Sequence, residues 1–152
     1  LQSRIKGMSV ILKALQTKSR LKSLCSRYQE RIAFRSTISQ HRQGEKIFDK
    51  DGDDDTIAFL IWGEVILKAD DGKTCQINHS QESSSYPLSK LKPRRYSAIA
   101  AKSQTCILWI NRRLLKECIA KQIIRNEQKL DSDCFEVTIR SPAETPFEAS
   151  AR

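Results

Sequence analysis

Residues 93–110 of this chain read Pro93-Arg94-Arg95-Tyr96-Ser97-Ala98-Ile99-Ala100-Ala101-Lys102-Ser103-Gln104-Thr105-Cys106-Ile107-Leu108-Trp109-Ile110. Two arginines stand beside a run of small residues, which allows a backbone to approach an anion closely. Guanidinium groups are well suited to phosphate and carboxylate because they offer forked donors. The apolar segment that ends at Ile110 is typical of a strand and would hold the preceding loop in place. The stretch therefore predicts an anion-binding loop on a β scaffold, although no carboxylate comes close before the arginines.

Length and composition favour one globular domain. The chain has 152 residues, of which 39% are hydrophobic, and this is enough for a sizeable core. No apolar run approaches the roughly 20 residues that span a bilayer. The sequence begins at Leu1 without a signal-peptide pattern, so we expect a piece of a longer, cytoplasmic protein. The five cysteines include no CxxC pair, which favours a reducing compartment, and two histidines are too few to predict a metal site.

The charge is unevenly distributed along the chain. Residues 1–46 carry a net charge of +9, residues 47–89 carry −6, residues 90–129 carry +9 and the remainder carries −3. Two basic ends therefore flank an acidic middle, a pattern that can steer a phosphate-bearing ligand or an acidic partner. A solvated basic helix at each end is the simpler interpretation.

Hydrophobic periodicity predicts helices at both ends and short strands between them. Residues 4–33 have a helical apolar stripe, and Asn111 can cap a second helix that runs from Arg112 to about Glu127. The predicted strands are Thr37–Ser39, Lys46–Phe48, Ala58–Trp62, Glu64–Ala69, Cys75–Ile77, Ser97–Ala101 and Thr105–Ile110. Gly63 and Asp70-Asp71-Gly72 mark turns, residues 79–85 are expected to form a loop, and Phe135–Ile139 is a weaker strand candidate. Trp62 and Trp109 are expected in the core.

This order of elements resembles the cyclic-nucleotide-binding domain family. The resemblance covers about residues 31–124 and rests on three segments: Gly44-Glu45-Lys46-Ile47-Phe48, Phe59-Leu60-Ile61-Trp62-Gly63-Glu64-Val65, and Ala101-Lys102-Ser103 through Leu108-Trp109-Ile110 to Leu114-Leu115. It implies a mainly β fold with flanking α-helices: an eight-stranded β-roll, a form of jelly roll, with N-terminal helices and a C-terminal helix. The domains implied are an N-terminal helical segment (1–34), the β-roll sensor domain (35–111), its C-terminal helix (112–129) and a linker or tail (130–152).

The resemblance also implies where a ligand would bind. The family holds a cyclic phosphate in a cassette through an arginine, which counting back from Ala101 places at Arg95. The remaining candidates for the ligand-binding cassette are Arg94, Tyr96, Ser97 and Leu88. No cofactor and no metal are expected, and the implied ligand is a cyclic nucleotide, cAMP or cGMP, or another anionic small molecule.

The cassette departs from the family pattern. The Gly-Glu pair that places a carboxylate on the ribose is replaced by residues in Ser84-Ser85-Tyr86-Pro87-Leu88, and Glu82 comes too early by count. Loss of that hydrogen bond should weaken nucleotide recognition. The cassette resembles that of a divergent bacterial branch, in which the domain is joined to other signalling modules.

Two interpretations of function stay open at this point. The first is a regulatory sensor that binds an anionic ligand at Arg95 and relays binding through the C-terminal helix to a linked or separate effector domain. The second is a degenerate β-roll that binds no nucleotide, in which Arg94 and Arg95 are solvated or paired with the acidic run Asp51–Asp55 and the basic helices mediate protein interaction or homodimerisation. Nucleic-acid binding is less favoured because aromatic residues are not interleaved with the basic ones. An enzyme is the weakest alternative, since neither histidine has an evident nucleophile partner in the sequence.

Overall fold

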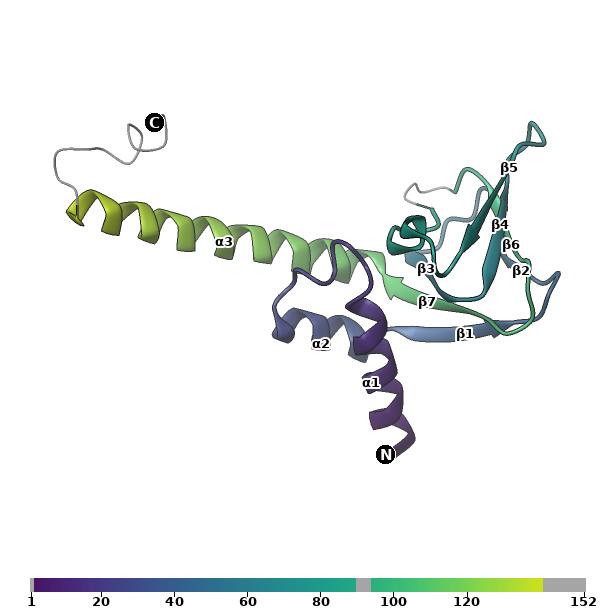
Figure 1. Ribbon diagram of the computed structural model, residues 1–152, viewed down its shortest axis with the longest axis horizontal. Coiled ribbons are helices and arrows are strands. Elements are labelled where there is room, and N and C mark those ends of the chain that lie inside the picture. The colour runs from purple at the N-terminus through teal and green to yellow at the C-terminus, as the bar shows by residue number, and fades with distance from the viewer. Residues whose placement is uncertain (1, 90–93, 141–152) are drawn as a thin grey trace. The chain divides into compact units, whose positions relative to one another are not determined.

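The computed structural model describes residues 2–89 and 94–140, with side chains described for residues 7–89 and 94–128. The chain divides into two compact units, Leu1–Lys116 and Glu117–Arg152. In chain order the elements are α1 (Gln2–Leu15), α2 (Ser26–Phe34), β1 (Thr37–His41), β2 (Lys46–Phe48), β3 (Thr56–Trp62), β4 (Glu64–Lys68), β5 (Thr74–Asn78), the 3₁₀ turn η1 (Glu82–Ser85), β6 (Ser97–Ala100), β7 (Thr105–Asn111) and α3 (Arg112–Arg140) (Figure 1).

The first unit is built on two antiparallel sheets. One has the strand order β1-β7-β3 and the other has the order β2-β6-β4-β5. Each strand coincides with a segment predicted from the sequence, and the mainly β fold with flanking helices is confirmed. The described residues contain seven strands rather than the predicted eight.

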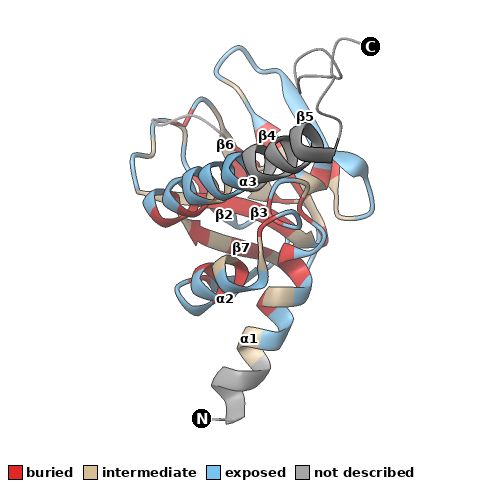
Figure 2. Ribbon diagram, turned by 90° about the vertical axis from the view of Figure 1, so that its left-hand side faces the viewer, coloured by how far each residue is buried: buried red, intermediate tan, exposed pale blue. Residues whose placement is uncertain are grey.

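The core lies between the two sheets. Strands β3 and β7 are rich in β-branched and aromatic residues, which favour a pleated, buried surface. Their central residues Leu60, Ile107 and Leu108 are fully buried. Figure 2 shows buried positions along both strands. The buried cluster consists of Ile47, Phe48, Ala58, Leu60, Val65, Leu67, Ile77, Leu88, Ala98, Ala100 and Ile107, with Tyr96 and Trp109 packed against it.

Two glycines form the turns that the sequence predicts. Gly63 joins β3 to β4 with a φ of +94°, and a Cβ there would lie 2.6 Å from Thr105 Oγ1. Only glycine tolerates both the backbone conformation and the close approach of β7. Gly72 has a φ of +85° in the turn between β4 and β5, where Ala69 N–H donates to the carbonyl of Lys73.

The predicted helix over residues 4–33 is wrong in one respect, because the structure breaks it into α1 and α2. The hydroxyl of Thr17 donates to Ala14 O and that of Ser23 donates to Arg20 O, and such bonds compete with helix continuation. Buried Gln29 then donates its side-chain amide to Leu21 O at 2.9 Å, which supports the non-helical connection.

The second unit contains most of α3. Asn111 caps this helix as predicted, since its side-chain oxygen accepts from Leu114 N–H at 2.9 Å. The helix continues to Arg140, so the predicted strand over Phe135–Ile139 is wrong. A short alternating pattern does not secure a pairing strand, whereas a helix satisfies its backbone hydrogen bonds within itself. Residues 141–152 of the predicted tail lie outside the described residues, and the domain boundaries stay a prediction.

The expectation that both tryptophans are core residues is half correct. Trp109 packs against the buried cluster, but Trp62 is 56% exposed at the end of β3 and stacks on His79 with ring centroids 4.0 Å apart. The pairing of β3 with β7 changes register between Leu60 and Trp62, and this irregularity breaks the strand alternation that would predict the direction of the side chain.

Candidate anion-binding site

The candidate site is formed by the part of the chain that connects β5 to β6. We call residues 82–89 and 94–97 the cassette segment; residues 90–93 between them lie outside the described residues. The segment begins with η1 and ends on the first residue of β6. Leu88 is buried, and its N–H donates to Ala58 O of β3 at 2.9 Å. The start of the segment is therefore held against the roll.

The two candidate arginines have different environments. Arg94 is buried, and its guanidinium lies 2.7 Å from the carboxylate of Asp54. The same group donates to Thr56 O at 3.0 Å and lies over the ring of Phe48. The second interpretation expected such a pair with the acidic run. Arg95 is exposed, and no polar partner of its side chain is found among the described residues.

Ser97 and Tyr96 complete the predicted set. The Ser97 hydroxyl accepts from the backbone N–H of Lys50 at 3.0 Å, which leaves its own proton available to a ligand. Tyr96 is half-buried and packs on the hydrophobic cluster, so its bulk contributes to the core. Arg95, Tyr96 and Ser97 thus follow one another directly at the start of β6, and Arg94 is buried immediately before them.

The acidic loop, residues 49–55, connects the cassette segment to the start of α3. At one side the backbone of Arg94 bonds to Asp51 N–H at 2.7 Å and to Gly52 O at 3.1 Å. At the other side Arg112 N–H donates to Asp55 O at 2.8 Å, and the guanidinium of Arg113 lies 3.2 Å from the Asp55 carboxylate. A single loop therefore contacts both the candidate site and the first turn of the helix.

A lysine that sequence reasoning missed contacts the first part of the cassette segment. Lys18, in the connection between α1 and α2, donates from Nζ to Leu60 O at 2.6 Å and to Ser84 O at 2.8 Å. Burial lowers the pKa of this lysine from 10.5 to about 8, because desolvation disfavours the charged form. Nothing in the basic sequence around Lys18 distinguishes it from its exposed neighbours.

The missing family carboxylate is not replaced by the residues of η1. Glu82 is exposed in its first turn, and Ser84 is buried with its hydroxyl donating to Gln81 O and His79 O. Within the part of the chain that the structure describes, no group of three or more metal-ligating side chains occurs, and no helix is long and apolar enough to span a membrane.

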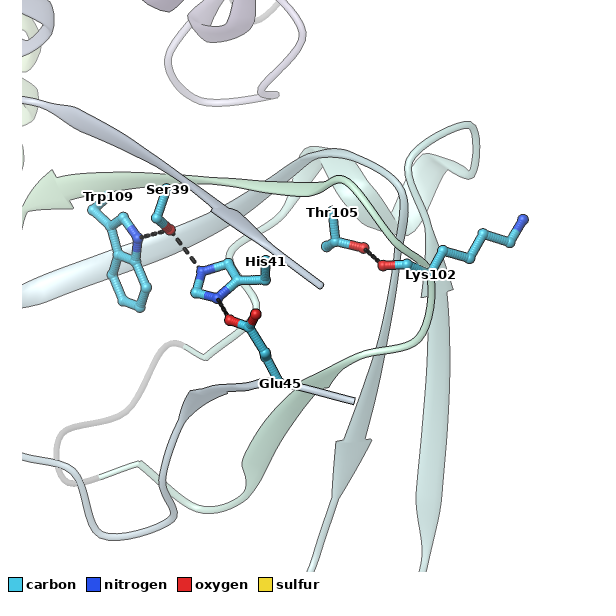
Figure 3. Close-up of polar contacts among 6 residues, drawn as sticks. All are labelled: Ser39, His41, Glu45, Lys102, Thr105 and Trp109. Atoms are coloured by element: carbon cyan, nitrogen blue, oxygen red, sulfur yellow. Dashed lines mark hydrogen bonds and ion pairs between the residues drawn. The ribbon is translucent and has the colours of Figure 1, made fainter. Parts of the chain in front are cut away.

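A polar cleft of about 360 Å³ lies near the turn between β6 and β7, lined by Gln40, His41, Arg42, Glu45, Ser103 and Gln104. At its edge His41 Nε2 lies 2.8 Å from Ser39 Oγ, a hydroxyl partner that was not evident from the sequence (Figure 3). Trp109 Nε1 also donates to Ser39 at 2.6 Å, and the Glu45 carboxylate lies 3.7 Å from His41 Nδ1. These contacts tie β1 to β7 through side chains.

Solved structures with the same fold include kinase regulatory proteins and a bacterial sensor. The cAMP-bound PfPKA-R is 18% identical, with a TM-score of 0.63, over 89% of this chain and 49% of that one. The sensor domain of the transcriptional regulator DNR from Pseudomonas aeruginosa is 12% identical, with a TM-score of 0.63, over 84% and 96%. A regulatory subunit of a cAMP-independent protein kinase A from Trypanosoma cruzi, bound to guanosine, is 16% identical, with a TM-score of 0.58, over 95% and 53%.

The sequence itself is divergent. No protein-family model and no curated protein sequence matches the chain. It spans about half the length of the kinase regulatory proteins that it matches in structure. At identities this low the likeness establishes the fold, and the predicted resemblance is confirmed at that level: the chain has the β-roll fold of cyclic-nucleotide-binding domains.

Proposed function

We propose that this chain, which has the cyclic-nucleotide-binding fold, is a non-catalytic regulatory module that senses an anionic small molecule. The ligand would bind at the end of the cassette segment, with its charge on Arg95 and a hydrogen bond from Ser97. Tyr96 and Leu88 would form the apolar support, and Arg94 would lie behind the anion. The effector would be a domain joined to this one or a separate protein, and the helices would supply a homodimer contact.

The arrangement of the acidic loop carries this proposal. Asp54 pairs with Arg94 and the adjacent Asp55 pairs with Arg113, so a change at the cassette arginine alters a contact of the first turn of α3. A ligand shifts such an equilibrium only by the difference in its affinity for the two arrangements. An anion near Arg94 competes with the Asp54 carboxylate for the same guanidinium, and this competition supplies the difference.

The structural neighbours support a nucleotide-like ligand as the first probe. One neighbour is bound to cAMP, and another, described as cAMP-independent, is bound to guanosine. The missing family glutamate removes a hydrogen bond to ribose, so we expect weaker and less selective nucleotide binding than in the family. Cyclic AMP and cyclic GMP are therefore tested together with guanosine, which lacks the phosphate.

Isothermal titration of the full chain with each compound tests the proposal. We expect cyclic nucleotides to bind and Arg95→Ala to weaken them by about tenfold, as loss of one charge-assisted contact predicts. Arg27→Ala is the matched control, because Arg27 is an exposed arginine of α2 outside both the cassette segment and the acidic loop. The absence of heat with millimolar ligand would overturn the proposal and favour the β-roll as a protein-interaction domain.

A further inference from the structure

Lys18 is buried without an acidic partner. Its side chain is 2% exposed, and among the described residues its ammonium contacts two backbone carbonyls and the ring of Phe59 but no carboxylate. Burial of a charged group is costly unless hydrogen bonds or an opposite charge compensate for it. A methionine of similar length would fill this space at lower cost. A lysine at this position is therefore explained by the two backbone carbonyls to which its ammonium donates.

The two carbonyls belong to different elements. Leu60 O lies in β3, and Ser84 O lies near the end of η1, a single 3₁₀ turn. The last carbonyls of a helical turn lack partners within the turn. Lys18 supplies one, and the neighbouring Ser19 N–H supplies a second by donating to Ser85 O at 3.2 Å. The connection between α1 and α2 thus closes the C-terminal end of η1.

The backbone around Lys18 is itself held in place by buried neighbours. The residues around it, Leu15 and Leu21, are buried. Gln29 of α2 is also buried; it donates to Leu21 O and to Leu24 O and accepts from the side chain of Gln16. Movement of α1 or α2 would therefore move the ammonium relative to η1.

We infer that Lys18 is a latch by which the N-terminal helices hold η1, and with it the first part of the cassette segment, against β3. Release of Lys18 removes the link from Ser84 O to Leu60 O, and among the described residues the backbone bond that then still joins the segment to β3 is that of Leu88 to Ala58. The N-terminal segment thereby sets how open the cassette segment is. Only the consequence for ligand binding rests on the proposed function; the latch itself is a property of the fold.

Native-state hydrogen exchange tests the latch without any ligand. In Lys18→Met we expect the amides of Ser84, Ser85 and Tyr86 to exchange about tenfold faster or more, while amides in the centre of β7 keep the wild-type rate. Lys22→Met is the matched control, because Lys22 is an exposed lysine in the same connection. Equal exchange of residues 84–86 in the wild type and Lys18→Met would overturn the inference.

A measurement on the wild-type chain keeps the test valid if Lys18→Met does not fold. A hydrogen-bonded, buried ammonium exchanges its protons slowly enough to give a nuclear magnetic resonance signal at pH 6, whereas the exposed Lys22 does not. Absence of a protected Lys18 ammonium would also overturn the latch. Titration with cyclic AMP then separates the two proposals. If the amides of residues 84–86 exchange slowly but cyclic AMP gives no heat of binding, the latch is retained and the proposed ligand is rejected. If cyclic AMP binds but these amides and the Lys18 ammonium are not protected from exchange, the latch is rejected and the ligand is retained.

Discussion

The guanidinium of Arg94 lies 2.7 Å from the Asp54 carboxylate, and the pair joins a side chain that is 4% exposed to one that is 58% exposed. This difference in exposure determines what each residue contributes to the ion pair. Asp54 can return to water, but Arg94 cannot, because Thr56 and the ring of Phe48 enclose it. The Asp54 carboxylate therefore neutralises a buried positive charge that would otherwise attract a ligand anion.

Asp54→Asn should destabilise the fold and improve anion binding at the same time. The substitution removes the charge that compensates Arg94, and we expect the free energy of unfolding to fall by about 1–2 kcal/mol in urea denaturation. Titration of the same variant with cyclic AMP should show tighter binding than the wild type, since the competing carboxylate is gone. Arg113→Ala breaks an exposed pair and should cost no more than about 0.5 kcal/mol. Equal stability of Asp54→Asn and the wild type would contradict this account of the pair.

Gly63→Ala should be far more damaging than Gly72→Ala, although both glycines have a positive φ. A Cβ at Gly63 would lie 2.6 Å from Thr105 Oγ1 and 2.8 Å from Thr105 Cα, whereas a Cβ at Gly72 meets no atom within 4 Å. We expect a loss of about 3 kcal/mol or more for Gly63→Ala, from strain and overlap together. The loss for Gly72→Ala should be about 1 kcal/mol, from the left-handed conformation alone. Thermal unfolding of the two variants measures the difference, and similar losses would disprove the steric argument.

The sequence predicts the strands well because their signals are local. Each strand is a short run of β-branched or aromatic residues between glycine or aspartate turns, and the cap on α3 is one asparagine three residues before the N–H that donates to it. The break between α1 and α2 depends instead on Gln29, which reaches back to carbonyls five and eight residues away. No periodicity within the helical stripe records that contact.

The candidate site was harder to predict because the residues in contact there are far apart in the sequence. Lys18 bonds to carbonyls that are 42 and 66 residues away, and Arg94 reaches Thr56 across 38 residues. Two adjacent arginines are equivalent in composition, and only the direction of the chain at the entrance to β6 determines which one is buried. Sequence reasoning therefore predicted a cassette segment but could not distinguish the environments of Arg94 and Arg95.

Asn111→Ala should shorten the start of α3. The side chain of Asn111 satisfies Leu114 N–H, one of the donors that a helix leaves without a partner, and its loss should cost about 1 kcal/mol. Asn126→Ala makes the same chemical change at an exposed position inside the helix, where alanine is the better helix former. Circular dichroism during urea unfolding should therefore show opposite shifts for the two variants. A shift in the same direction for both would mean that Asn111 does not act as a cap.

Lys18→Met should change how stability depends on pH. In the folded chain the pKa of Lys18 is about 8, against 10.5 without burial, so between these values the unfolded chain binds more protons at this site. Stability therefore rises with pH across this window in the wild type but not, from this source, in Lys18→Met. The free energy of unfolding of the wild type relative to the variant should increase by up to about 3 kcal/mol from pH 7 to pH 10.5, because a tenfold change in a proton-binding constant is worth about 1.4 kcal/mol. Below pH 8 the relative free energy should level off, since both the folded and the unfolded chain are then protonated at this lysine.

Urea unfolding of the wild type, Lys18→Met and Lys22→Met in this pH range measures the effect of Lys18, and titration of the other groups cancels in the comparison. Lys22→Met should follow the wild type at every pH, because Lys22 is exposed in the same connection. A relative free energy of Lys18→Met that does not change between pH 7 and pH 10.5 would mean that burial does not lower the pKa of Lys18 in the folded chain.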